Sequence, residues 1–167
     1  MGKKSKILYF SVLIVNIICF ILDLLPINFP FFRISFSVSL MLIGILLFVR
    51  SVTLKIDSSM FIGNTLFLLG VINFTMYFLQ VYKNVDSNQF WPYYLFALAI
   101  ASLITGLYFK DKFQFKLFTL FLGFGIIVLL FTLDLINLWW MIGLLVAYFV
   151  LYFVINMLIF RKRRKNG

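Results

Sequence analysis

The 167-residue chain is 64% hydrophobic and only 12% charged, and it carries a formal net charge of +10 without any histidine. A water-soluble core could not hide so much apolar surface in a chain of this size, so lipid has to cover it. The basic residues lie at the ends of apolar runs and not along a polar face, so we expect no nucleic-acid partner.

Six apolar runs follow one another, with only short connections between them. They comprise residues 7–25, 34–49, 60–82, 92–109, 115–135 and 138–160. At the helical rise of about 1.5 Å per residue each run is about as long as a bilayer core is thick, although the second and fourth need flanking residues to complete the span. The sequence therefore predicts one all-α domain over residues 1–167, an integral membrane bundle of six transmembrane helices arranged as three hairpins.

The basic residues favour one side of the membrane. If the amino terminus is cytoplasmic, 13 of the 15 Lys and Arg residues share its side, and only Arg33 and Lys83 lie opposite. The positive-inside rule then predicts a multi-pass cell-membrane protein with both termini in the cytoplasm. A basic cluster directly follows the last run, where we expect it to fix topology and to contact anionic lipid headgroups at about 1 kcal/mol per residue. The cluster consists of Arg161, Lys162, Arg163, Arg164 and Lys165.

Small residues recur at spacings that are typical of close helix packing. The candidates are Gly63, Gly70, Ala97, Ala101, Gly123, Gly143 and Ala147. They can pack helices within the chain or form a surface that receives another membrane protein. Asn16 and Asn73 lie near the middle of their spans, so we expect their amides to bond across helices, with a ligand or ion site as the alternative.

Asp23 and Asp134, near the outer ends of two spans, are the acids with the most chemical promise. Two carboxylates that share a proton can activate water, which makes an outer-leaflet aspartyl protease a remote alternative. The simpler interpretation is that both acids mark the water interface. The chain has no histidine and no glutamate, and Cys19 is its only cysteine, which excludes Ser–His and Cys–His catalysis, His-ligated zinc or haem, and an internal disulfide. We therefore predict no enzymatic activity and no cofactor or metal.

A faint internal repeat relates residues 66–70 to residues 119–123, and residues 90–92 to residues 138–140. Both matches would equate the second predicted hairpin with the third. Duplication and chance similarity among few residue types remain alternatives.

Three segments together resemble a known type of membrane region. They are residues 40–47 leading to Arg50-Ser51, the stretch from Gly63 to Gly70, and Phe90-Trp91-Pro92 before another apolar run. Over Ser39–Phe109 the chain resembles the LiaI-LiaF-type transmembrane region of Gram-positive envelope-stress proteins. The resemblance implies a regulatory or scaffolding role. Proteins of the LiaF type carry a soluble carboxy-terminal domain, whereas this chain ends at Gly167, so contacts are expected from the helices or very short loops.

The leading expectation is a non-enzymatic bacterial inner-membrane protein that acts through helix contacts with another membrane protein or with itself, besides its contacts with membrane lipids. The bacterial source rests on this resemblance and on a composition rich in Phe, Ile and Asn with four alanines. The alternative is a small transport component, such as a substrate-binding membrane subunit. A shortage of polar groups on any common face and the lack of mid-span prolines argue against it.

Overall fold

The computed structural model describes residues 3–24, 31–83 and 90–165, with side chains for residues 7, 10–24, 31–83 and 90–157. These residues form six helices: α1 (Lys3–Asp23), α2 (Phe31–Leu54), α3 (Asp57–Lys83), α4 (Trp91–Phe109), α5 (Lys112–Thr132) and α6 (Leu138–Lys165). The predicted all-α fold is confirmed. Five helices, α2 to α6, are long and apolar enough to cross a membrane, and the described apolar part of α1 is the shorter stretch Phe10–Asp23.

Several helices begin or end at other residues than the apolar runs do, because local interactions determine the helix ends. α5 begins before its predicted start, because the Asp111 carboxylate accepts a hydrogen bond from the Phe113 N–H at 2.9 Å and caps the helix. It ends at Thr132 because Asp134 takes a left-handed backbone conformation, with φ of 56°. The backbone of α6 continues through the basic cluster to Lys165, where positive charge is favourable at a helix carboxyl end.

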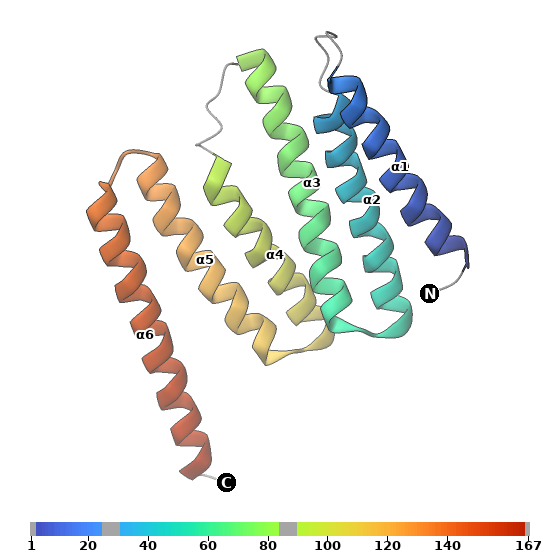
Figure 1. Cartoon of the computed structure of the whole chain (residues 1–167). Helices are drawn as coiled ribbons and strands as arrows, with labels where there is room; N and C mark the ends of the chain where they lie inside the picture. Colours follow the sequence, from blue (N-terminus) through green and yellow to red (C-terminus); the bar gives the residue numbers. More distant parts are fainter. Residues whose placement is uncertain (1–2, 25–30, 84–89, 166–167) are drawn as a thin grey trace.

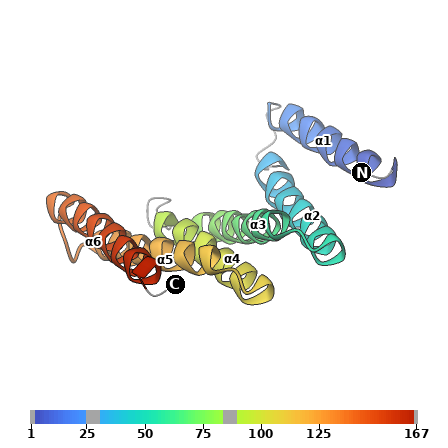
Figure 2. The same ribbon diagram turned by 90° about the horizontal axis from the view of Figure 1, so that it is seen from below.

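The six helices stand side by side in chain order and form an open row (Figure 1). Every extensive helix contact joins neighbours in the chain, and the interfaces α2–α3 and α4–α5 are the largest. Seen from below, the row bends, with α1 and α6 at its two ends (Figure 2). The helices that pack most extensively are therefore those joined by a connection on the predicted cytoplasmic side. The pairs α1–α2, α3–α4 and α5–α6, joined on the opposite side, have smaller interfaces.

The hairpins α2–α3 and α4–α5 share local features at positions 55 residues apart in the chain. Lys55 and Lys110 both adopt left-handed φ values, 53° and 54°, directly after the first helix of each pair. In each hairpin the next N–H then bonds back five residues, to the Ser51 and Gly106 carbonyls respectively. Further along, Gly70 lies against Met41 just as Gly125 lies against Phe96. The structural similarity therefore relates α2–α3 to α4–α5, whereas the faint sequence repeat would relate α3–α4 to α5–α6.

Candidate functional site

Three glycines bring the backbones of α2 and α3 into contact. A Cβ on Gly44 would lie 2.7 Å from the Gly63 carbonyl oxygen, and one on Gly70 would lie 2.7 Å from the Ser37 carbonyl oxygen. On α2, Ser37, Gly44 and Ser51 are all buried and recur every seventh residue. We call the five residues Ser37, Gly44, Ser51, Gly63 and Gly70 the small-residue seam. It accounts for Gly63 and Gly70 as packing residues and adds Gly44, which the sequence reasoning missed.

The other small residues fall into two groups. Ala97 and Ala101 are buried on α4, and a Cβ on Gly123 would overlap the Tyr148 ring of α6. On α6, by contrast, a Cβ on Gly143 would meet nothing within 4 Å, and Ala147 is exposed. These last two residues therefore pack against no other helix of the described chain.

α6 is attached to α5 by tyrosines. The Tyr148 hydroxyl donates to the Thr119 carbonyl at 2.5 Å, and the Tyr152 hydroxyl donates to the Lys116 carbonyl at 2.8 Å. Together with Leu145, these tyrosines recur at spacings of three and four residues, which places them on one side of the helix. Sequence reasoning missed this contact, although that spacing was a usable signal.

Asn16 joins α1 to the first half of α2. Its amide N–H donates to the Ser39 hydroxyl at 2.6 Å, and its carbonyl accepts from the Ser35 hydroxyl at 3.2 Å. The same amide nitrogen also donates to the Val12 carbonyl of its own helix at 2.8 Å. These bonds satisfy the Asn16 amide within the protein, although Asn16 also lines an otherwise mainly apolar pocket of about 460 Å³ between α1 and α2.

Asn73 lies in a different interface. Its side-chain carbonyl accepts a hydrogen bond of 2.7 Å from the Tyr94 hydroxyl of α4. Asn16 and Asn73 therefore lie in the separate interfaces α1–α2 and α3–α4 and do not converge on one polar site. The midplane site that a transport component would need is not built from these two amides.

The two acids of the proposed dyad also lie apart. Asp23 closes α1 at one end of the row, whereas Asp134 follows α5 near the other, with α3 and α4 between them (Figure 1). The Asp23 carboxylate accepts a hydrogen bond from the Phe32 N–H at 3.0 Å, in the first turn of α2. Asp23 thus caps the start of α2. The aspartyl-protease alternative requires the Asp23 and Asp134 carboxylates to lie side by side, and the fold does not bring them together.

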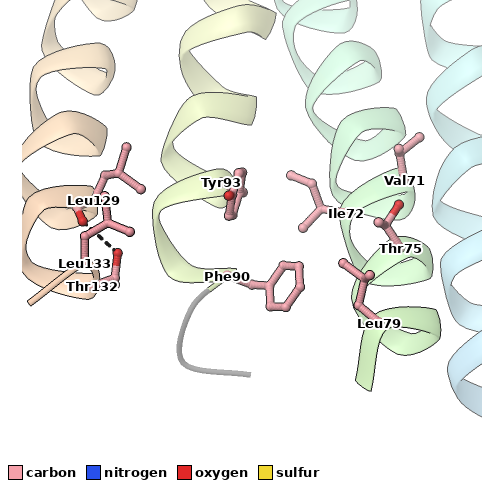
Figure 3. A pocket seen from close by; sticks show the side chains of 9 residues that line it. All are labelled: Val71, Ile72, Thr75, Leu79, Phe90, Tyr93, Leu129, Thr132 and Leu133. Atoms are coloured by element: carbon pink, nitrogen blue, oxygen red, sulfur yellow. Dashed lines mark hydrogen bonds between the residues drawn. The ribbon is translucent and has the colours of Figure 1, made fainter. Parts of the chain in front are cut away.

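Two further pockets lie toward the end of the row where α2 begins and α3 ends. One, of about 460 Å³, lies among α3, α4 and α5; it is lined mainly by apolar side chains, and Thr75, Tyr93 and Thr132 carry its side-chain hydroxyls (Figure 3). The other, of about 340 Å³, lies between α2 and α3 and includes Arg33, Asn73 and Gln80. We call it the Arg33 pocket.

Within the described ranges, no three His, Cys, Asp or Glu side chains come together as a metal site would need. The backbone of the basic cluster Arg161–Lys165 belongs to α6, but its side chains lie outside the described part of the chain. No family model, curated protein or solved structure matches this chain. The resemblance to the LiaI-LiaF-type region therefore stays a prediction.

Proposed function

We propose that this protein is a non-enzymatic membrane scaffold or regulator that binds another membrane protein through its helices. The observation that carries the proposal is the open row, in which the one extensive contact of α6 among the described residues is with α5. The far face of α6 consists of Gly143, Ala147, Val150 and Val154, all of them exposed. Their spacings of four, three and four residues make one continuous stripe of small side chains, directed away from the tyrosines that bind α5.

A stripe of this kind suits a second helix better than it suits lipid alone. Lipid offers little solvophobic drive for helix association, so close backbone approach at small residues is a main source of affinity. The resemblance over residues 39–109 points to the same role. A transport function gains no comparable support, because the two mid-span amides are bonded in separate interfaces.

The proposal includes a membrane arrangement. Six spans, with α1 as the sixth, place both termini in the cytoplasm of a bacterial cell, and the distribution of Lys and Arg supports this orientation. The basic cluster at the end of α6 would then meet the anionic headgroups of the inner leaflet.

In-cell photocrosslinking tests the partner contact. A photoreactive phenylalanine analogue at Val150, on the far face, should give one product of fixed stoichiometry with a membrane protein or with a second copy. The same group at Leu145, which faces α5, should give only crosslinks within the chain. Gly143→Leu should abolish the Val150 product because it fills the stripe, whereas Gly143→Ala should keep it. A product at Val150 that survives Gly143→Leu, or no product at all, would refute the proposal.

A further inference from the structure

The Arg33 pocket exists because the small-residue seam stops short of the end of the hairpin. Gly70 is the last seam residue of α3, and its neighbour Ser37 lies on the pocket wall. Beyond Gly70, α3 presents Asn73, Met76 and Tyr77 toward α2. These larger side chains leave a space between the two helices that opens toward the start of α2 and the end of α3.

Polar groups in the pocket have hydrogen-bonding capacity to spare. Arg33 is exposed and forms no ion pair with an acid in the described part of the chain. Because the Asn73 carbonyl is taken by Tyr94, its NH₂ group is the side that remains available to donate. Gln80 forms no side-chain hydrogen bond with any described residue. The pocket therefore offers a ligand the Arg33 guanidinium, the Asn73 NH₂ group and the Gln80 amide as hydrogen-bond donors.

The related hairpin α4–α5 shows that packing does not require this polarity. At the shared spacing of 55 residues, Asn73 corresponds to Val128, and Tyr77 corresponds to Thr132, where α5 ends. α3 continues beyond that point to Lys83 and so adds Gln80 and Lys83 to its end. Among the described residues, α5 thus has no counterpart of these two amides, because Val128 replaces Asn73 and Gln80 lies on an extension that α5 lacks.

Charge singles out the same end of the molecule. Arg33, near the start of α2, and Lys83, at the end of α3, are the two basic residues on the predicted outer side. Since Lys and Arg are disfavoured on that side, the position of Arg33 on a pocket wall there suggests a role beyond topology. The single positive charge on the pocket wall, that of Arg33, matches the single negative charge of one phosphodiester.

We propose that the Arg33 pocket binds the phosphate headgroup of an anionic lipid in the outer leaflet. Arg33 holds the phosphate, and the amides of Asn73 and Gln80 donate to headgroup oxygens. Phe32, Phe36 and Met76 form an apolar wall along which an acyl chain lies. Asn73 and Gln80 are about 10 Å apart along α3, so the donors reach from the interface toward the membrane interior, which a lipid spans and a free phosphate ion does not. This site is independent of the partner proposed for α6.

Native mass spectrometry of the full-length chain in detergent tests the site, with dioleoyl phosphatidylglycerol as the anionic probe. One tightly bound lipid is expected, and dioleoyl phosphatidylcholine should bind at least about tenfold more weakly. Arg33→Gln should weaken phosphatidylglycerol binding by at least about tenfold, the usual scale for losing a hydrogen bond to a charged group. Arg50→Gln is the matched control, because Arg50 is an exposed arginine at the other end of α2. It should leave the affinity unchanged.

The opposite results would overturn the proposal. These are equal affinity for both lipids, wild-type affinity in Arg33→Gln, or an equal loss in Arg50→Gln. Displacement of the lipid by inorganic phosphate at comparable affinity would instead reveal a site for the free anion and would also refute it. If Arg33→Gln does not fold, Gln80→Leu decides, since it should lower the affinity about fivefold and an unchanged value would contradict the proposal.

Discussion

Gly44 of α2 and Gly63 of α3 each place a carbonyl oxygen where the other would carry a Cβ. The two hypothetical distances are 2.7 Å from the Gly44 Cβ to the Gly63 oxygen and 2.9 Å from the Gly63 Cβ to the Gly44 oxygen. Because both obstacles are backbone atoms, neither can move without shifting a whole helix. These two residues therefore set the separation of α2 and α3, the pair with the largest interface in the row.

Replacing either glycine of this pair should destabilise the protein. We expect Gly44→Ala and Gly63→Ala each to cost about 1–3 kcal/mol in the free energy of unfolding, as overpacked contacts do. Unfolding in mixed detergent and dodecyl sulfate micelles, followed by circular dichroism, measures the change. Gly143→Ala is the control and should be nearly neutral, because that position is open. Wild-type stability in Gly44→Ala would contradict the close contact.

Asp23 should behave as a structural cap and not as an acid catalyst. Asp23→Ala should lower stability by about 1 kcal/mol, because the Phe32 N–H loses its acceptor, whereas Asp23→Asn should retain most of it since Asn caps helices equally well. Limited proteolysis of the purified protein reports the loosening of α1 from α2. A variant Asp23→Asn as unstable as Asp23→Ala would show that the negative charge, and not the cap, is what matters.

The hydrogen bond between Tyr94 and Asn73 should make a small, measurable contribution. A double-mutant cycle with Tyr94→Phe and Asn73→Leu should give a coupling of about 0.6 kcal/mol, the average for such bonds between membrane helices. Tyr93→Phe serves as the comparison, because the neighbouring Tyr93 side chain is half exposed. Its coupling to Asn73→Leu should be close to zero, and an equal coupling at Tyr93 would argue against a specific bond.

The proposed orientation can be read from cysteine accessibility. In a Cys19→Ser background, a cysteine at Leu135 should react with a membrane-impermeant maleimide in intact cells. A cysteine at Ser58 should react only after the cells are permeabilised, because the proposed orientation puts the start of α3 on the cytoplasmic side. Both positions are exposed, so burial does not confound the comparison. The reverse labelling pattern would invert the topology.

The helices were predictable because each needs only a long apolar run, and that signal is local. Their ends were less predictable: Lys55 and Asp134 stop helices by adopting left-handed conformations that neither residue type announces. Only part of the small-residue seam was predicted from the sequence. Gly63 and Gly70 were found by their spacing of seven residues, but the same spacing of Ser37, Gly44 and Ser51 on α2 was overlooked because two of its members are serines.

Spacing also cannot say whether a small residue has a partner. Gly123 and Gly143 fit the same kind of pattern, yet the first lies beneath Tyr148 and the second faces open space. The Arg33 pocket was out of reach for a related reason. Arg33 and Asn73 are 40 positions apart in the chain, and only the packing of α2 beside α3 brings them to one pocket.

The open row has a consequence for how the chain is made. Since each helix finds its main contacts on the helix before and the helix after it, no helix has to wait for a distant segment to be synthesised. Contacts this local are the kind that form quickly, and they can be completed one hairpin at a time as the ribosome delivers the chain to the membrane. We expect the pair α2–α3 to assemble as soon as α3 has been inserted, and α6 to be the last helix added and the first to separate.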